Sequence, residues 1–148
     1  MMNNWFECKV AHNKVMENGL EKKVTESYII EALSFTEAEA RLIEYIRPFI
    51  DGEFLVTAVG RKKYSEVFNN DSDAADLWFH AKLMFVTLDE RTGAEKKTAC
   101  FALVQAADIR EAIKHLDAQM RGTLCDYVIA EMKETTIMDV LRYEAEEV

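Results

Sequence analysis

The sequence is poor in proline, glycine and cysteine, and it contains no long hydrophobic run. One proline and five glycines among 148 residues exclude a collagen-like chain and a low-complexity disordered one. No apolar run approaches the roughly 18 residues that a membrane-spanning helix needs. The first residues have neither the basic nor the apolar segment of a signal peptide. We therefore expect a cytoplasmic globular protein, about one domain in size, with no membrane partner.

Cysteine is too scarce and too dispersed to build a disulfide framework or a metal site. The three cysteines are Cys8, Cys100 and Cys125. An odd number without a C-x-x-C pair favours reduced thiols, which we expect to be buried as small apolar side chains. The three histidines do not have the mutual spacing of a zinc site. We expect no metal and no other cofactor.

Acidic residues outnumber basic ones by 27 to 18, which gives a formal net charge of -9. Such an acidic protein does not wrap nucleic acid with its whole surface and has no general affinity for anionic membranes. The sequence also lacks a nucleophile elbow, a glycine-rich phosphate loop and a zinc-protease helix motif. We therefore predict no catalytic residues and a protein that is not an enzyme.

The chain is an internal duplication, visible as four blocks that recur in the same order at a nearly constant offset. The matched blocks are Trp5–Val10 with Trp78–Leu83, Gly19–Lys23 with Gly93–Lys97, Ala32–Ala38 with Ala106–Ala112, and Phe54, Val56, Val59, Val67 with Tyr127, Ile129, Met132, Val140. Recurrence in the same order predicts two copies of one structural unit. We expect a single compact domain over residues 1–148, with repeat one at 1–70 and repeat two at 75–143.

Each repeat has the pattern of two strands, a helix and a third strand. Aromatic and β-branched residues predict paired strands at 5–16 and 21–33, and again at 77–88 and 95–107. Ser34 and Asp108 are predicted helix N-caps, each followed by apolar residues at helical spacing. Third strands begin near Phe54 and Tyr127, and residues 64–68 and 137–141 are candidates for a short fourth strand.

This pattern predicts an α+β protein. The repeated unit is ββαβ(β), with one helix per repeat, antiparallel sheets and a pseudo-two-fold axis that relates the repeats. A single unit of this size would leave a sheet face and two edges uncovered, so two copies are expected to share a core. The acidic tail at 144–148 is expected to fray.

Four segments carry a resemblance to other chains. They are Trp5-Phe6-x-x-Lys9, Lys22–Glu26, Ala32–Ala40 and Gly93–Lys97. These segments resemble an uncharacterised bacterial family, a domain of unknown function of about this chain's length that also occurs in phage-like genetic contexts. The block Phe35-Thr36-Glu37-Ala38-Glu39-Ala40 is its most recognisable part. The resemblance covers essentially the whole chain and slightly favours DNA metabolism, but it implies no catalytic residue, substrate or cofactor.

Basic residues gather in three clusters on this acidic background. They are Lys22 and Lys23, Lys96 and Lys97, and Arg61 with Lys62 and Lys63. Local positive charge can bind a polyanion even when the net charge is negative. Trp5 and Trp78 begin the first strand of each repeat, where exposed rings would stack on unpaired bases. These nine residues are a candidate site for single-stranded nucleic acid, although edge-strand lysines also serve simply to prevent aggregation.

Another protein is the second class of ligand that the sequence leaves open. Duplicated α+β units often leave sheet edges that can pair with another chain. The seven methionines suit an adaptable contact surface, and they equally suit gap filling in a core. The residues narrowly favour a non-catalytic protein that binds single-stranded nucleic acid. The alternative is a protein-interaction module or a homodimeric regulatory protein of mobile-element origin.

Overall fold

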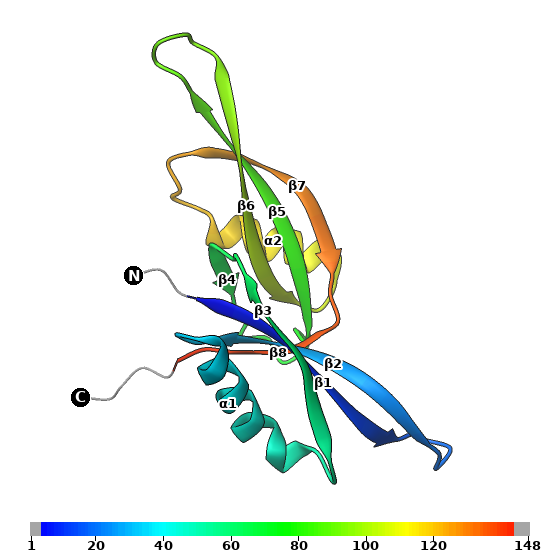
Figure 1. Cartoon of the computed structure of the whole chain (residues 1–148). Coiled ribbons are helices and arrows are strands. Elements are labelled where there is room, and N and C mark those ends of the chain that lie inside the picture. The colour runs from blue at the N-terminus through cyan, green and yellow to red at the C-terminus, as the bar shows by residue number, and fades with distance from the viewer. Residues whose placement is uncertain (1–3, 144–148) are drawn as a thin grey trace, which may run out of the picture. The chain divides into compact units, whose positions relative to one another are not determined.

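A computed structural model describes residues 4–143 and shows an α+β protein, as the sequence predicts; the acidic tail at 144–148 lies outside the described residues. The described chain forms two compact units (Figure 1). Residues 4–63 and 137–143 make up the first unit, and residues 64–136 make up the second. Each unit contains one four-stranded sheet and one α-helix. Neither helix within residues 4–143 is long and apolar enough to cross a membrane.

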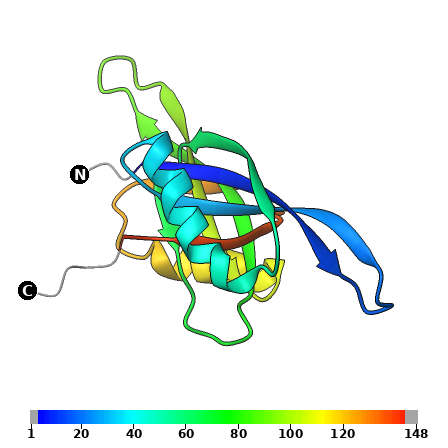
Figure 2. The ribbon, with the colours of Figure 1, turned by 60° about the horizontal axis from the view of Figure 1, so that its bottom comes forward.

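The first unit is a sheet of strand order β3-β1-β2-β8 with a helix along one face (Figures 1 and 2). Its elements are β1 (Trp5–Val15), β2 (Glu21–Glu31), α1 (Phe35–Ile46), the 3-10 helix η1 (Arg47–Phe49), β3 (Phe54–Lys62) and β8 (Ile137–Leu141). β1 pairs in antiparallel fashion with β2 and β3, whereas β8 pairs in parallel with β2.

The second unit repeats this arrangement with the strand order β4-β6-β5-β7. Its elements are β4 (Glu66–Phe68), β5 (Leu77–Leu88), β6 (Glu95–Ala106), α2 (Ile109–Gln119) and β7 (Asp126–Glu134). Opposite Lys9 and Val10 of β1, the register shifts because β3 carries one extra residue, Thr57. The same shift recurs opposite Lys82 and Leu83 of β5, where β7 carries one extra residue. A bulge bends and twists a strand, so the two sheets share a local irregularity as well as a topology.

The two repeats exchange their last strands. β4 follows β3 along the chain but is hydrogen-bonded to β6 of the second unit. In the same way, β8 follows β7 but is hydrogen-bonded to β2 of the first unit. The registers correspond, because Tyr28 lies opposite Asp139 and Ala102 lies opposite Glu66. The sequence predicts these short strands, and the structure adds that each completes the sheet of the other repeat.

Hydrogen bonds to Arg41 and Glu31, together called the latch, hold the end of β8 against the rest of the first unit. The Arg41 guanidinium donates to the carbonyl oxygen of Arg142 at 2.9 Å, and it also donates to the carbonyl oxygen of Glu31. The buried Glu31 carboxylate accepts the backbone N–H of Tyr143 at 2.8 Å. A hydrogen bond to a charged group contributes more to stability than one between neutral groups. These contacts therefore stabilise the exchanged strand in addition to its backbone hydrogen bonds with β2.

The second unit holds the chain after β4 with the equivalent residues. His115 donates from Nε2 to the carbonyl oxygen of Asn69 at 2.8 Å, and Gln105 Oε1 accepts the backbone N–H of Asn70 at 3.0 Å. His115 and Gln105 occupy the positions in the second repeat that Arg41 and Glu31 occupy in the first. The duplication therefore preserves the latch positions while histidine and glutamine replace Arg41 and Glu31.

Both helices begin at the predicted N-caps. The Ser34 hydroxyl accepts from the Glu37 N–H at 3.1 Å, and the Asp108 carboxylate accepts from the Glu111 N–H at 2.8 Å. The returning carboxylate of Glu37 accepts from the N–H of Leu33, one residue before the cap, rather than from the cap itself. The bonds accepted by Ser34 and Asp108 satisfy N–H groups that the first turn of a helix leaves without a partner.

In the first unit the helix covers only the inner part of the sheet. The core between them contains Phe6, Val10 and Ile30 from the strands, and Leu42 and Ile46 from α1. The 12-residue helix α1 is about 18 Å long, whereas an 11-residue strand spans about 36 Å. The outer ends of β1 and β2 therefore project beyond the helix as a hairpin arm (Figure 2). Side chains on the inner face of this arm lie outside the apolar core.

The prediction that all three cysteines are buried is correct only for Cys8. Cys8 packs in the core of the first unit, and burial, together with the charges of Glu39 and Glu7, raises the pKa of its thiol to about 11. This thiol is therefore protonated and unreactive at neutral pH. Cys100 is partly exposed on β6, and Cys125 is exposed because it lies in the loop before β7.

Candidate functional site

The basic residues of the first unit form two separate clusters. Lys22, at the start of β2, lies opposite Lys14 near the outer end of β1. Arg61, near the end of β3, lies opposite Phe6 near the beginning of β1. The stretch of β1 from Phe6 to Lys14 corresponds to about 26 Å of extended strand. All seven basic residues of the predicted site are exposed: Lys22, Lys23, Arg61, Lys62, Lys63, Lys96 and Lys97.

The neighbours of these basic residues differ between clusters. In the second unit, Lys96 and Lys97 lie at the start of β6, as Lys22 and Lys23 do on β2. The Arg61 guanidinium lies 5.6 Å from the ring centroid of Phe6 and 6.0 Å from that of Phe35. Arg61 therefore makes cation–π contacts with the buried ring of Phe6 and the exposed ring of Phe35, while the lysine pairs on the hairpins face solvent.

The tryptophans are not available to stack on bases, which corrects the role suggested for exposed rings. The exposed fractions are 3% for Trp5 and 1% for Trp78. The guanidinium of Arg142 lies 5.6 Å from the centroid of the Trp5 ring. The neighbouring Phe6 and Phe79 are also buried. Both aromatic residues at the start of each repeat therefore stabilise the fold.

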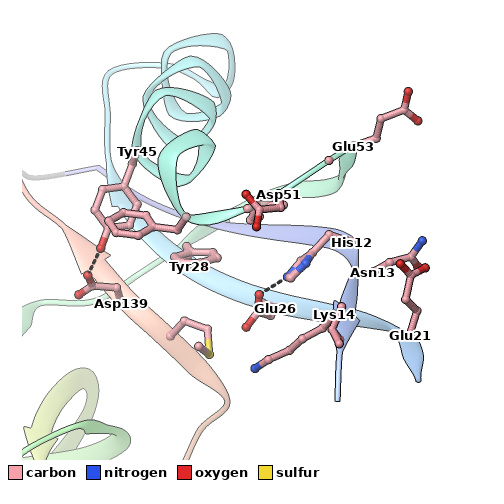
Figure 3. A pocket seen from close by; sticks show the side chains of 15 residues that line it. His12, Asn13, Lys14, Glu21, Glu26, Tyr28, Tyr45, Asp51, Glu53 and Asp139 are labelled. Carbon is pink, nitrogen blue, oxygen red and sulfur yellow. Dashed lines mark hydrogen bonds and ion pairs between the residues drawn. The ribbon is translucent and has the colours of Figure 1, made fainter. Parts of the chain in front are cut away.

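A pocket that the sequence analysis missed lies in the first unit, with a volume of about 780 Å³. It forms where the hairpin arm of β1 and β2 projects beyond α1, and the loop after η1 and the start of β8 close its sides (Figure 3). The lining residues thus come from segments that are far apart in the sequence. The difference in length between the strands and α1 explains why the sheet face is open here.

Two hydrogen-bonded pairs form the polar part of the pocket. His12 on β1 bonds through Nε2 to the Glu26 carboxylate on β2, and their side chains are only 9% and 16% exposed. The Tyr45 hydroxyl, at the end of α1, donates to the Asp139 carboxylate on β8 (Figure 3). Burial and this hydrogen bond raise the pKa of Tyr45. Tyr45 is therefore a neutral hydrogen-bond donor at physiological pH.

Three aromatic rings form a wall beside these pairs. The rings of Tyr28 and Tyr45 meet edge to face with centroids 6.3 Å apart, and those of Tyr45 and Phe49 are 5.5 Å apart. Tyr28 is buried and Phe49 is 74% exposed, so the wall runs from the interior of the pocket to its rim. Burial also raises the pKa of Tyr28, which keeps this ring neutral as well.

The pocket is predominantly acidic. Its lining includes the five carboxylates of Glu21, Glu26, Asp51, Glu53 and Asp139, against one lysine, Lys14, and one histidine, His12. Glu21, Asp51 and Glu53 are exposed at the rim. Within residues 4–143, no three His, Cys, Asp or Glu side chains are grouped closely enough to hold a metal ion. The negative charge is therefore spread around the opening.

A family model described as a domain of unknown function, DUF4494, matches residues 4–143 of this chain. The chain belongs to the DUF4494 family. A search of the curated proteins found no significant match, and neither did a search of the solved structures. Membership of DUF4494 confirms the resemblance at the level of a family of unknown function. The site residues of this DUF4494 chain are therefore assigned from geometry.

The second unit of the DUF4494 fold lacks this polar cluster. The positions equivalent to His12, Glu26, Tyr28, Tyr45 and Asp139 hold Phe85, Cys100, Ala102, Gln119 and Glu66. The second unit has the same strand order and the same helix placement without them. The fold therefore does not require the cluster. Comparing the two repeats position by position is the sequence signal that finds the pocket.

Proposed function

We propose that the protein is a non-catalytic binding protein and that the pocket of the first unit is its binding site. The observation that carries this proposal is the divergence of the two repeats at equivalent positions. One repeat supplies a histidine, two tyrosines and a glutamate where the other has side chains without charge. Buried polar groups are costly unless they are paired, so a cluster that the fold does not need points to a ligand.

The side chains of the pocket suit binding better than catalysis. Among the described residues that line it, none is Ser, Thr or Cys. His12 is paired with Glu26 and has no serine, threonine or cysteine nucleophile beside it among the described lining residues. Tyr45 has a raised pKa and is not an activated base. Rings and carboxylates at the edge of an open cavity recognise a ligand by shape and charge.

Tyr45→Ala should weaken ligand binding about ten-fold, because it removes the centre of the aromatic wall and the donor to Asp139. Gln119→Ala is the matched control, since Gln119 is the exposed equivalent on α2. Fluorescence anisotropy would measure binding of four labelled probes. They are short peptides in which alanine alternates with arginine, glutamate or glutamine, and a single-stranded oligonucleotide.

The proposal requires that at least one probe binds and that only Tyr45→Ala weakens it. Circular dichroism spectra that match the wild type would show that both variants keep the fold. Binding that survives Tyr45→Ala, or that falls equally in both variants, would place the site elsewhere. Failure of all four probes to bind would count against a binding function at this pocket.

Single-stranded nucleic acid is the second candidate ligand, and the exposed lysine pairs on both hairpins favour it. The mobile-element association that the resemblance implies is compatible with this ligand. The oligonucleotide should then bind more weakly at about 200 mM salt than at about 50 mM, because phosphate contacts release counterions. The double variant Lys22→Glu/Lys96→Glu should lose that binding. Absence of binding at the lower salt concentration would eliminate this candidate.

A further inference from the structure

We infer that the pocket of the first unit takes the arginine or lysine side chain of a basic protein segment. This inference rests on the proposed function, because it names the ligand of the same pocket. It combines three properties of the site, which are the sign of its charge, the arrangement of its rings and its openness to solvent. Each property selects among classes of ligand independently of the others.

The charge of the rim selects a cation. Asp51 and Glu53 follow η1, and Glu21 begins β2, so two segments contribute three exposed carboxylates to the lining (Figure 3). The structure of residues 4–143 shows none of these three in a salt bridge. Among the described residues of the lining, Lys14 is the only lysine or arginine. A cation that enters would gain attraction from several directions, and an anion would be repelled.

The aromatic wall selects an organic cation over a metal ion. Tyr28, Tyr45 and Phe49 offer ring faces and edges along one side of the pocket, and Ile50 and Met138 add apolar surface. A guanidinium or ammonium group is attracted to ring faces, while its alkyl stem packs on apolar side chains. Metal ions need converging ligands, and no such group exists among the described residues.

The openness of the pocket selects a side chain that belongs to a larger molecule. Free small molecules generally bind in cavities that enclose most of their surface. Here the outermost ring, Phe49, is 74% exposed, and the rim carboxylates are exposed as well. A side chain presented by a partner chain needs less enclosure, because the rest of the partner makes contacts outside the pocket. A basic protein segment therefore fits better than a free polyamine.

The test is a comparison of two double variants that change the net charge equally. Asp51→Asn/Glu53→Gln neutralises two rim carboxylates, whereas Asp126→Asn/Glu131→Gln neutralises two exposed carboxylates of β7. Anisotropy of the labelled arginine–alanine peptide would measure affinity at fixed salt. We expect about ten-fold weaker binding in the rim variant and less than about two-fold in the β7 variant. All four positions are exposed, so both variants should fold.

The other outcomes contradict the inference in distinguishable ways. An equal loss of affinity in both double variants would show that the peptide is attracted only by the net charge of the protein. Binding of the glutamate peptide or the oligonucleotide that depends on Tyr45 would overturn the choice of a cation but leave the proposed function intact. Spermidine would be added as a fifth probe, and its binding without any binding of the arginine–alanine peptide would overturn the choice of a protein side chain. Failure of every probe would overturn the inference and the proposed function together.

Discussion

Removing residues 137–148 should unfold the first unit, although most of that unit lies at the other end of the chain. These residues include β8, the partner of β2 in the sheet. Ile137 and Val140 are buried, and burying one such side chain contributes about 1.5–3 kcal/mol. The truncation would also leave Glu31 without the Tyr143 N–H and Tyr45 without Asp139. The expected loss is at least several kcal/mol of unfolding free energy in a domain of marginal stability.

Hydrogen exchange measured by mass spectrometry would test this prediction. Amides of β1 and β2 should lose protection, while those of β5 and β6 should lose less, because their unit keeps all four of its strands. The double variant Ile137→Ala/Val140→Ala is a milder change than the truncation, because it removes apolar contacts of β8 without removing any residue. It should weaken protection of β2 in the same direction. Full protection of β1 and β2 in the truncated chain would contradict the exchanged-strand topology.

Leu42→Ala should lower the free energy of unfolding by about 2–5 kcal/mol, the range for creating a cavity in a core. Leu42 is fully buried on α1 and packs in the core cluster of the first unit. Leu116, its equivalent in the second repeat, is fully buried in the cluster of the second unit. Leu116→Ala should therefore have an effect of similar size.

Chemical denaturation followed by circular dichroism would measure both variants against a surface control. Glu44→Ala, on the exposed side of α1, should change the free energy of unfolding by less than about 0.5 kcal/mol. A cost below about 1 kcal/mol for Leu42→Ala would mean that α1 does not pack on its sheet as described. The number of transitions would also test the prediction of a single compact domain.

The internal duplication explains how much of the fold the sequence predicts. Two copies of each signal, such as Ser34 with Asp108 and Gly19 with Gly93, support one another, and the structure has strands, helices and turns at these places. Both glycines adopt the positive φ angle that the tight hairpin turns require. Local signals of this kind depend on neighbouring residues, so they are readable without knowledge of the tertiary structure.

The exchange of β4 and β8 depends on information that local patterns do not contain. An alternating segment identifies a strand, but either free sheet edge could accept it. Only two residues separate β7 from β8, and three separate β3 from β4. Short connections normally join neighbouring strands, so the pattern favours pairing within a repeat. The latch residues Arg41 and His115 differ in type and give no common sequence signal.

The candidate site shows the same contrast between local and distant information. Lysine pairs stand out in the sequence because their members are adjacent, and they are exposed as expected. The pocket was missed because His12, Tyr45 and Asp139 come together only through the fold. The sequence makes Trp5 and Trp78 candidates for base stacking because aromatic residues serve both binding and packing. Their burial shows that packing is the role here.

The measurement that tests the central claim most directly is a nuclear magnetic resonance titration of the isotope-labelled protein with the arginine–alanine peptide. The account predicts chemical-shift changes concentrated at the pocket, in residues 12–15, 21–28 and 45–53. The equivalent residues of the second unit, around Phe85, Cys100 and Gln119, should change little. Shift changes confined to the second unit would contradict the claim that the first unit carries the binding site, and no change at any peptide concentration would contradict the choice of a basic segment as its ligand.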